Sequence, residues 1–225
     1  MASTTIDIDT ELSAVNNILG AIGQSPITAL GNVSTTVTTD ANGVQTTTSS
    51  FDNPEVSFIY NLLRDANVDT QAEGWHFNTE KHVKYTPDSV TGKIAIGNDI
   101  LSMDAHDNHI RRQYNLVRRN GFLYDKQDHT DDFSTVDSIH LDVVRLYNFE
   151  DLPIIFRRFI TYRAAVMAAT QLVANPQLVR LLTNNASLAR AALQEYECNQ
   201  GDHNMFGFED DTAYQTYQPW RNLRR

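Results

Sequence analysis

The chain has 225 residues, which is enough for one domain, or for a core that carries an inserted lobe. Its formal net charge of −10 disfavours ordinary DNA binding, because such binding relies on basic surface that displaces counterions from phosphate. The single cysteine, Cys198, excludes an internal disulfide framework and fits a reducing compartment. No apolar run approaches the roughly 20 residues of a membrane helix. Residues 1–5 lack the basic and apolar regions of a secretion signal, so none is expected.

The N-terminal part predicts a flexible arm followed by one amphipathic helix. Residues 1–8 are small and polar, so we expect them to form the arm. Asp9 or Thr10 is a suitable N-cap for a helix that ends at Gly23, shortly before Pro26. The apolar positions of this helix recur at helical spacing: Leu12, Val15, Leu19 and Ile22.

Residues 33–50 differ from the rest of the chain because they are rich in threonine and carry almost no charge. Two threonine-rich runs flank Asn42-Gly43, a dipeptide that favours a hairpin turn, so the segment predicts a β-hairpin. Its faces carry little apolar surface. The hairpin is therefore expected to leave the core, or to form an edge that pairs with another subunit. A flexible polar loop is the alternative.

A second helix and a β region follow. Asn53-Pro54 is a cap followed by a proline, and apolar residues at helical spacing continue from Val56 towards Gly74. From Trp75 onwards the chain is typical of strands, and Asn120-Gly121 favours a tight hairpin turn. The candidate strands are residues 81–85, 93–96, 114–118, 122–125 and 138–147.

The stretch 151–201 predicts two long helices that follow each other directly. Pro153 fits the first turn of one helix, and Asn175-Pro176 ends it and starts the next, which stops at Gly201. With only a turn between them, the two helices are expected to lie antiparallel. The first helix is apolar along Ile155, Phe159, Tyr162, Val166, Ala169 and Val173, and along Phe156, Ile160 and Met167; the second is apolar along Leu178, Leu182, Ala186, Ala189, Leu193 and Tyr196.

Together these elements predict an α+β fold: an antiparallel bundle of about four helices, with a small antiparallel β-sheet lobe inserted between helices two and three. The helical core takes residues 9–74 and 151–201, with 33–50 as an excursion, and the β lobe takes residues 75–150. Residues 202–225 end in aromatic and basic side chains and predict a C-terminal docking tail, with plain disorder as the alternative.

The densest set of potential metal ligands is Asp104, His106, Asp107 and His109, because carboxylate and imidazole suit zinc or manganese. Their spacing matches no established motif, and a solvated polar loop is the favoured interpretation. Paired carboxylates can cleave glycosides as general acid and base, but neighbouring carboxylates on exposed segments usually only solvate the chain. The candidate pairs are Glu195 with Glu197, Asp131 with Asp132, and Asp210 with Asp211.

Other reactive or cationic side chains have simple interpretations. Cys198 lies near two glutamates whose charge disfavours a thiolate, so a packed or inert thiol is expected. Arg157, Arg158 and Arg163 on one helix suggest nucleic-acid contact, but a solvated face or acidic partners is the favoured reading. Trp75 is expected to anchor the core rather than to stack on a base. No catalytic, cofactor-binding or metal-binding residue is assigned, and no cofactor is expected.

Several short motifs follow one another in order along residues 11–205. They are Glu11-Leu12-Ser13-Ala14-Val15-Asn16 with Ile18-Leu19, Ile22-Gly23 and Pro26; Gly74-Trp75-His76-Phe77-Asn78; Asn120-Gly121-Phe122-Leu123-Tyr124-Asp125; Asp151-Leu152-Pro153 with Phe156; Asn175-Pro176; and Glu195-Tyr196-Glu197. In order and placement they resemble motifs of the tail tubular protein A family of T7-like podoviruses, the adaptor proteins of short-tailed phages. No single motif is specific. Residues 33–50 look like an insertion, and the end of the chain around Trp220 is longer than the family pattern.

The resemblance implies a structural virion protein without enzymatic activity. Members form a ring of twelve copies between the portal of the head and the tail nozzle, which tubular protein B forms, and they extend the DNA channel. The implied partners are further copies of the chain, the portal, the nozzle and the tail fibre, with assembly in the host cytoplasm. Double-stranded DNA would pass without specific binding, and no membrane is a partner. We expect the 33–50 hairpin and the tail from Tyr214 to contact the portal or other tail proteins.

Two other functions remain open from the sequence. A tail-associated hydrolase acting on a host envelope polysaccharide or peptidoglycan would lose its activity on substitution of one or two carboxylates. A metal-stabilised binding module would be revealed by metal analysis of the purified protein. For an adaptor, the acidic composition suggests a channel surface that repels phosphate during genome ejection.

Overall fold

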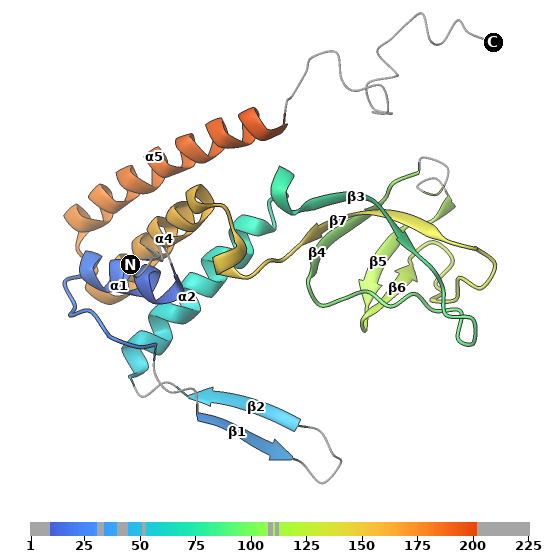
Figure 1. The fold of residues 1–225 in the computed structure, drawn as a ribbon, viewed down its shortest axis with the longest axis horizontal. Coiled ribbons are helices and arrows are strands. Elements are labelled where there is room, and N and C mark those ends of the chain that lie inside the picture. The colour runs from blue at the N-terminus through green and yellow to red at the C-terminus, as the bar shows by residue number, and fades with distance from the viewer. Residues whose placement is uncertain are drawn as a thin grey trace, which may run out of the picture.

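The computed structural model describes residues 10–30, 34–39, 45–50, 53–107, 110 and 113–201. Within these residues the predicted α+β class is confirmed: four long helices surround one core, and a small antiparallel sheet lies between the second and third of them. Figure 1 shows the helices at one end of the molecule and the β lobe at the other. The predicted arm, the predicted tail and the Asn42-Gly43 turn lie outside the described residues.

The elements follow one another in the predicted order. The helices are α1 (Glu11–Ala21), α2 (Pro54–Gln71), α4 (Ile154–Ala168) and α5 (Pro176–Gly201), with 3₁₀ turns η1 (His76–Asn78) and η2 (Phe149–Asp151) and a π-helical turn η3 (Ala169–Val173). The strands are β1 (Ser34–Thr39), β2 (Gln45–Ser50), β3 (Thr79–Tyr85), β4 (Ile100–Ala105), β5 (Leu116–Arg119), β6 (Phe122–Asp125) and β7 (Ile139–Arg145). β1 pairs with β2, β7 lies between β3 and β4, and β5 pairs with β6, all antiparallel. β1 and β2 pair within the stretch predicted as the 33–50 hairpin, while the predicted turn itself lies outside the described residues.

Polar caps start three of the four long helices. Thr10 caps α1, since its side-chain oxygen accepts a hydrogen bond from the Ser13 N–H at 3.3 Å. Asn53 and Asn175 cap α2 and α5 in the same way, each accepting from the second residue after it at 3.0 Å. Pro153 was predicted inside the first turn of α4, and this is wrong by one position. It is the N-cap, because η2 turns the chain directly before it.

The helical core is built around α4, which contacts α1, α2 and α5. Its buried side takes Phe156 and Ile160 from the second predicted stripe, Phe159 from the first, and small residues. The buried residues are Phe156, Phe159, Ile160, Thr161, Ala164, Ala165 and Ala168, while Met167 of the second stripe is only partly buried. The first predicted stripe is only partly buried, because Tyr162 and Val173 are each 40% exposed. The stripe of α5 is confirmed, with Leu182 and Leu193 fully inside. Among the described helices, none has both the length and the apolar character that crossing a bilayer requires.

The β lobe has its own core, which confirms the alternation predicted for residues 138–147. Its buried side chains are Ile94, Ile96, Ile100, Leu123, Phe133, Ile139, Leu141 and Val143. Asn120 and Gly121 have φ values of 53° and 79°, as a two-residue turn between strands requires. The strand predicted at 93–96 is wrong, since only an isolated bridge at Ala95 forms there. β4 was not predicted, because a bulge between Ile100 and Ser102 breaks the alternation along this edge strand.

A buried amide joins the helical core to the β lobe. The side chain of Gln71, at the end of α2, accepts a hydrogen bond from the Tyr147 N–H at 2.8 Å and donates one to the Tyr147 carbonyl at 2.9 Å. The amide of Asn78 donates to the carbonyls of Gln71 and Arg145 at 2.8 and 3.0 Å. The carbonyl of Arg145, at the end of β7, and the N–H and carbonyl of Tyr147, just after it, are thus hydrogen-bonded to side chains. These bonds join the helical core to the β lobe.

Replacing Gln71 with leucine is expected to lower the free energy of unfolding by about 2 to 4 kcal/mol. Leucine fills a similar volume, but it leaves the N–H and carbonyl of Tyr147 without their partners. Chemical denaturation followed by circular dichroism measures the loss. Gln194→Leu, at an exposed position of α5, is the control and should stay within about 0.5 kcal/mol of the parent protein. Equal effects of the two substitutions would contradict a joining role for Gln71.

Candidate subunit interface

Large apolar side chains remain exposed along the α4–α5 hairpin. Leu181 and Leu188 on α5 are 63% and 69% exposed, and Tyr162 on α4 remains partly open to solvent as well. Leu172 and Val173 in η3 are also exposed. Leu181 and Leu188 are seven residues apart, so they lie on the same side of α5. We refer to Tyr162, Leu172, Val173, Leu181 and Leu188 as the α4–α5 apolar surface.

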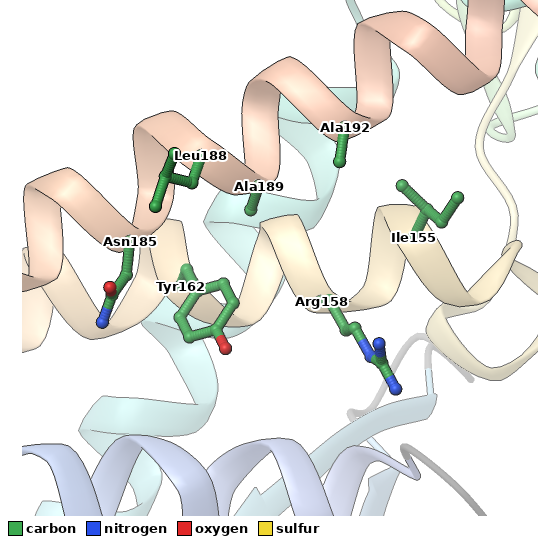
Figure 2. A pocket seen from close by; sticks show the side chains of 7 residues that line it. All are labelled: Ile155, Arg158, Tyr162, Asn185, Leu188, Ala189 and Ala192. Atoms are coloured by element: carbon green, nitrogen blue, oxygen red, sulfur yellow. The ribbon is translucent and has the colours of Figure 1, made fainter.

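Two hollows lie beside α4 and are continuous with this surface. One, of about 340 Å³, opens between α4 and α5, and the other, of about 310 Å³, is lined by residues of α1, α4 and α5. Arg158 and Tyr162 line both hollows. In Figure 2, Leu188, Ala189 and Ala192 point from α5 towards α4, while Arg158 and Tyr162 extend from α4 towards α1. The Tyr162 ring is thus a ridge between two depressions.

The middle of α5 carries no charge. Residues 181–189 contain no charged side chain, although the whole chain has a formal net charge of −10. Among the residues that line the two hollows, Arg158 alone is charged. An uncharged apolar surface can be covered by another protein without removing water from ionised groups. The arrangement suits docking of another protein surface.

Two of the three predicted carboxylate pairs lie in the described residues, and their side chains have separate surroundings. Glu195 and Glu197 are two positions apart on α5 and so point to different sides. Glu197 accepts a hydrogen bond from a backbone N–H of η1 at 2.7 Å, which fastens α5 to the start of the β lobe. Asp131 forms an ion pair with Lys93 at 2.6 Å, and Asp132 accepts a backbone N–H of its own turn at 2.9 Å. The third predicted pair lies outside the described residues.

The predicted metal-ligand set is divided by the structure. Asp104 lies on β4 and not in a loop, which corrects the prediction. His106 and Asp107 follow directly, and the side chains of Asp107 and His140 approach to 3.7 Å. His109 lies outside the described residues. Within the part of the chain that the structure describes, no three histidine, cysteine or acidic side chains are placed to hold a metal ion.

Three imidazoles gather where β3, β4 and β7 meet, and the sequence did not indicate this cluster. The ring of His82 lies 4.6 Å from that of His106 and 4.2 Å from that of His140, centre to centre. His106 Nδ1 lies 2.8 Å from the carboxylate of Asp142, which also accepts a hydrogen bond from the backbone N–H of His82 at 2.9 Å. The residues come from three strands, so no local spacing links them. The outward alternation of His140 and Asp142 was the only available signal.

The remaining singled-out residues have structural roles. Trp75 is a core anchor, as predicted, since it is buried and its indole N–H donates to a carbonyl of α2 at 2.6 Å. Arg163 pairs with acidic neighbours, as predicted, at 3.0 Å from Asp69 and 3.7 Å from Glu73. Cys198 was predicted to be packed or inert; it is exposed on α5, so the packed alternative is wrong and the inert one stays a prediction.

A buried carboxylate organises the loop after β6. Burial by itself would raise the pKa of Asp125, but hydrogen bonds from the backbone N–H groups of Gln127, Asn115 and Asp128 outweigh it and lower this pKa. These bonds measure 3.0, 2.8 and 3.1 Å. A depressed carboxyl pKa stabilises the fold above its unfolded value, and this stability is lost as the pH falls through the folded value. Acid should therefore weaken the β lobe.

Asp125→Asn is expected to make unfolding less dependent on acid. At pH 7 the variant should lose about 1 to 3 kcal/mol, because a neutral amide accepts the backbone N–H groups more weakly and must also place its own N–H₂. Below about pH 4 the difference from the parent should shrink, because the carboxyl binds a proton there in the unfolded chain before it does so in the folded one. Unfolding curves at pH 7 and pH 3 test both points. A difference that does not change with pH would refute the assignment.

Comparison with known protein families agrees with the geometry. The family model described as tail tubular protein matches residues 12–203, which include all four long helices and the β lobe. No curated protein sequence matches the chain. The matched stretch covers both hollows and the α4–α5 apolar surface. On this match, the chain belongs to the tail tubular protein family and is a structural protein of a phage virion tail.

Proposed function

We propose that this chain is the head-to-tail adaptor of a short-tailed phage, a ring of twelve copies that joins the portal to the tail nozzle and extends the DNA channel. The observation that carries the proposal is the α4–α5 apolar surface, with Leu181 and Leu188 standing on an uncharged stretch of helix beside the two hollows. A subunit that works alone has no reason to expose such a surface, whereas a ring covers it on every copy.

The parts of the chain have separate tasks in this ring. The helical core, residues 9–74 and 151–201, makes the contacts between neighbouring copies through α4 and α5. The inserted β lobe, residues 75–150, extends away from that core towards other components of the junction. The arm, residues 1–8, and the tail, residues 202–225, reach neighbours, and Tyr214 begins the segment of the tail that docks on the portal, the nozzle or the tail fibre.

The ring needs no cofactor, metal or membrane, and it acts by assembly in the host cytoplasm and not by catalysis. Double-stranded DNA passes through its channel without specific binding. The net charge of −10 supports an acidic channel wall, since repulsion from phosphate prevents adhesion of the moving genome. A channel wall rich in arginine and lysine in the assembled ring would contradict this point.

Electron microscopy and native mass spectrometry of the purified full-length chain, alone and mixed with portal, test the proposal. Closed rings that cap the portal are the expected result, and the measured mass gives the number of copies. Monomers that never join the portal would refute it. So would virions that lack this protein but retain their packaged genome and bear complete tails.

A further inference from the structure

The β1–β2 hairpin forms a sheet of its own. Its six residue pairs run in unbroken register from Ser34 opposite Ser50 to Thr39 opposite Gln45. Within the described residues, neither strand joins the two sheets of the β lobe. Figure 1 shows the hairpin below the helices, apart from that lobe. A two-stranded ribbon is marginal in water by itself, so this one requires a further partner to be stable.

Both outer edges of the hairpin are open to strand addition. In each strand, alternate N–H and carbonyl groups point towards the sister strand, and those between them point outwards. Proteins usually protect such edges with lysine, proline or a bulge. Residues 34–39 and 45–50 contain no charged residue and no proline, and their register has no shift. β3 and β4, by contrast, both carry irregularities against β7. The hairpin edges therefore lack the usual protection.

We propose that neighbouring copies pair hairpin to hairpin, with β2 of one copy beside β1 of the next, to form a continuous antiparallel β-belt. This inference rests on the proposed ring. The two outer edges are different surfaces, so their pairing is head-to-tail, which is the contact type that closes into rings. The strand directions also alternate correctly from one copy to the next, and a closed belt leaves no free edge.

Charge favours a second copy as the occupant of the edge. Two copies that each carry a net charge of −10 repel one another, and only a contact free of charge avoids adding like charges at close range. The two hairpin strands provide a contact of that kind. Threonine and valine, which fill most of residues 34–39, also have a high propensity for strands and stabilise paired sheets.

Hydrogen exchange on the ring of the full-length chain, without portal, tests the belt. Neighbouring residues of a strand direct their N–H groups to opposite edges, so one of Val37 and Thr38 faces outwards. In the ring, both amides should exchange slower than in the isolated subunit, the outward one by about tenfold or more. Unchanged exchange of the outward amide in an intact ring would overturn the belt and leave the adaptor proposal standing. Protection that arises only after portal is added would also overturn it, because the portal would then be the occupant.

Two proline variants provide a second measurement. Val37→Pro and Thr38→Pro remove adjacent N–H groups, so one variant weakens the hairpin and the other weakens only its outer edge. Both should reduce ring formation at limiting protein concentration by about tenfold or more. Full assembly by either variant would refute the belt. Failure of the parent protein to form a ring either alone or on the portal would refute the adaptor proposal and the belt together.

Discussion

Replacing Phe156 with alanine is expected to lower the free energy of unfolding by about 3 to 5 kcal/mol. Phe156 is completely buried at the start of α4. Its ring meets those of Trp75 at 5.3 Å, Phe77 at 4.5 Å and Tyr196 at 6.2 Å, centre to centre. Trp75 and Phe77 lie at the start of η1 and within it, and Tyr196 lies on α5. The Phe156 side chain therefore packs against two segments that are far apart in the sequence, and its removal leaves a cavity that neither can fill alone.

The matched control is Phe58→Ala on α2, because Phe58 is 37% exposed and sits outside this ring cluster. We expect it to cost less than about 1.5 kcal/mol. Thermal unfolding followed by calorimetry should show a midpoint lower by roughly 6 to 20 °C for Phe156→Ala, given 2 to 4 °C per kcal/mol in a chain of this size. A control that is as damaging as Phe156→Ala would show that the ring cluster is not the centre of the core.

Local signals sufficed for most helices and turns of this fold. Asn53-Pro54 and Asn175-Pro176 carry a cap and a proline in neighbouring positions, so the start of each helix is fixed within a few residues. Asn120-Gly121 likewise needs only its own two residues to form a tight turn. Where all of the information lies within one turn of chain, the prediction was correct.

Features set by distant pairing were missed. β4 has a weak pattern of its own and becomes a strand because β7 provides its backbone partners. The cluster of His82, His106 and His140 exists only in the register of three strands. The exposure of Tyr162 has a similar cause, since helical periodicity shows that a side chain is apolar but not which neighbour covers it.

The proposed contact between copies explains why some apolar residues are exposed in the single subunit. Periodicity predicted Tyr162 and Val173 as core residues, and in the single subunit they are not covered. Both belong to the α4–α5 apolar surface. Their apolar spacing predicts burial, and a neighbouring copy that packs against this surface would provide the burial that the single subunit lacks. The same side chains would then be buried in the ring.

Leu188→Glu is therefore expected to abolish ring formation while leaving the subunit folded. Leu188 is 69% exposed in the single chain, and glutamate favours helices, so the free energy of unfolding should change by less than about 1 kcal/mol. In the ring, the new carboxylate would be buried among apolar groups without a partner. This costs about 2 to 4 kcal/mol at each contact and raises the concentration needed for assembly by about a hundredfold.

Gln194→Glu is the matched control, because it adds one negative charge at an exposed position of α5 that lines neither hollow. Sedimentation velocity and electron microscopy should show rings for the control and single subunits for Leu188→Glu, with equal helical content by circular dichroism. Rings formed by Leu188→Glu at the parent concentration would place the contact between copies on another surface. Loss of rings in both variants would instead indicate that added charge alone prevents assembly, since the chain already carries a net charge of −10.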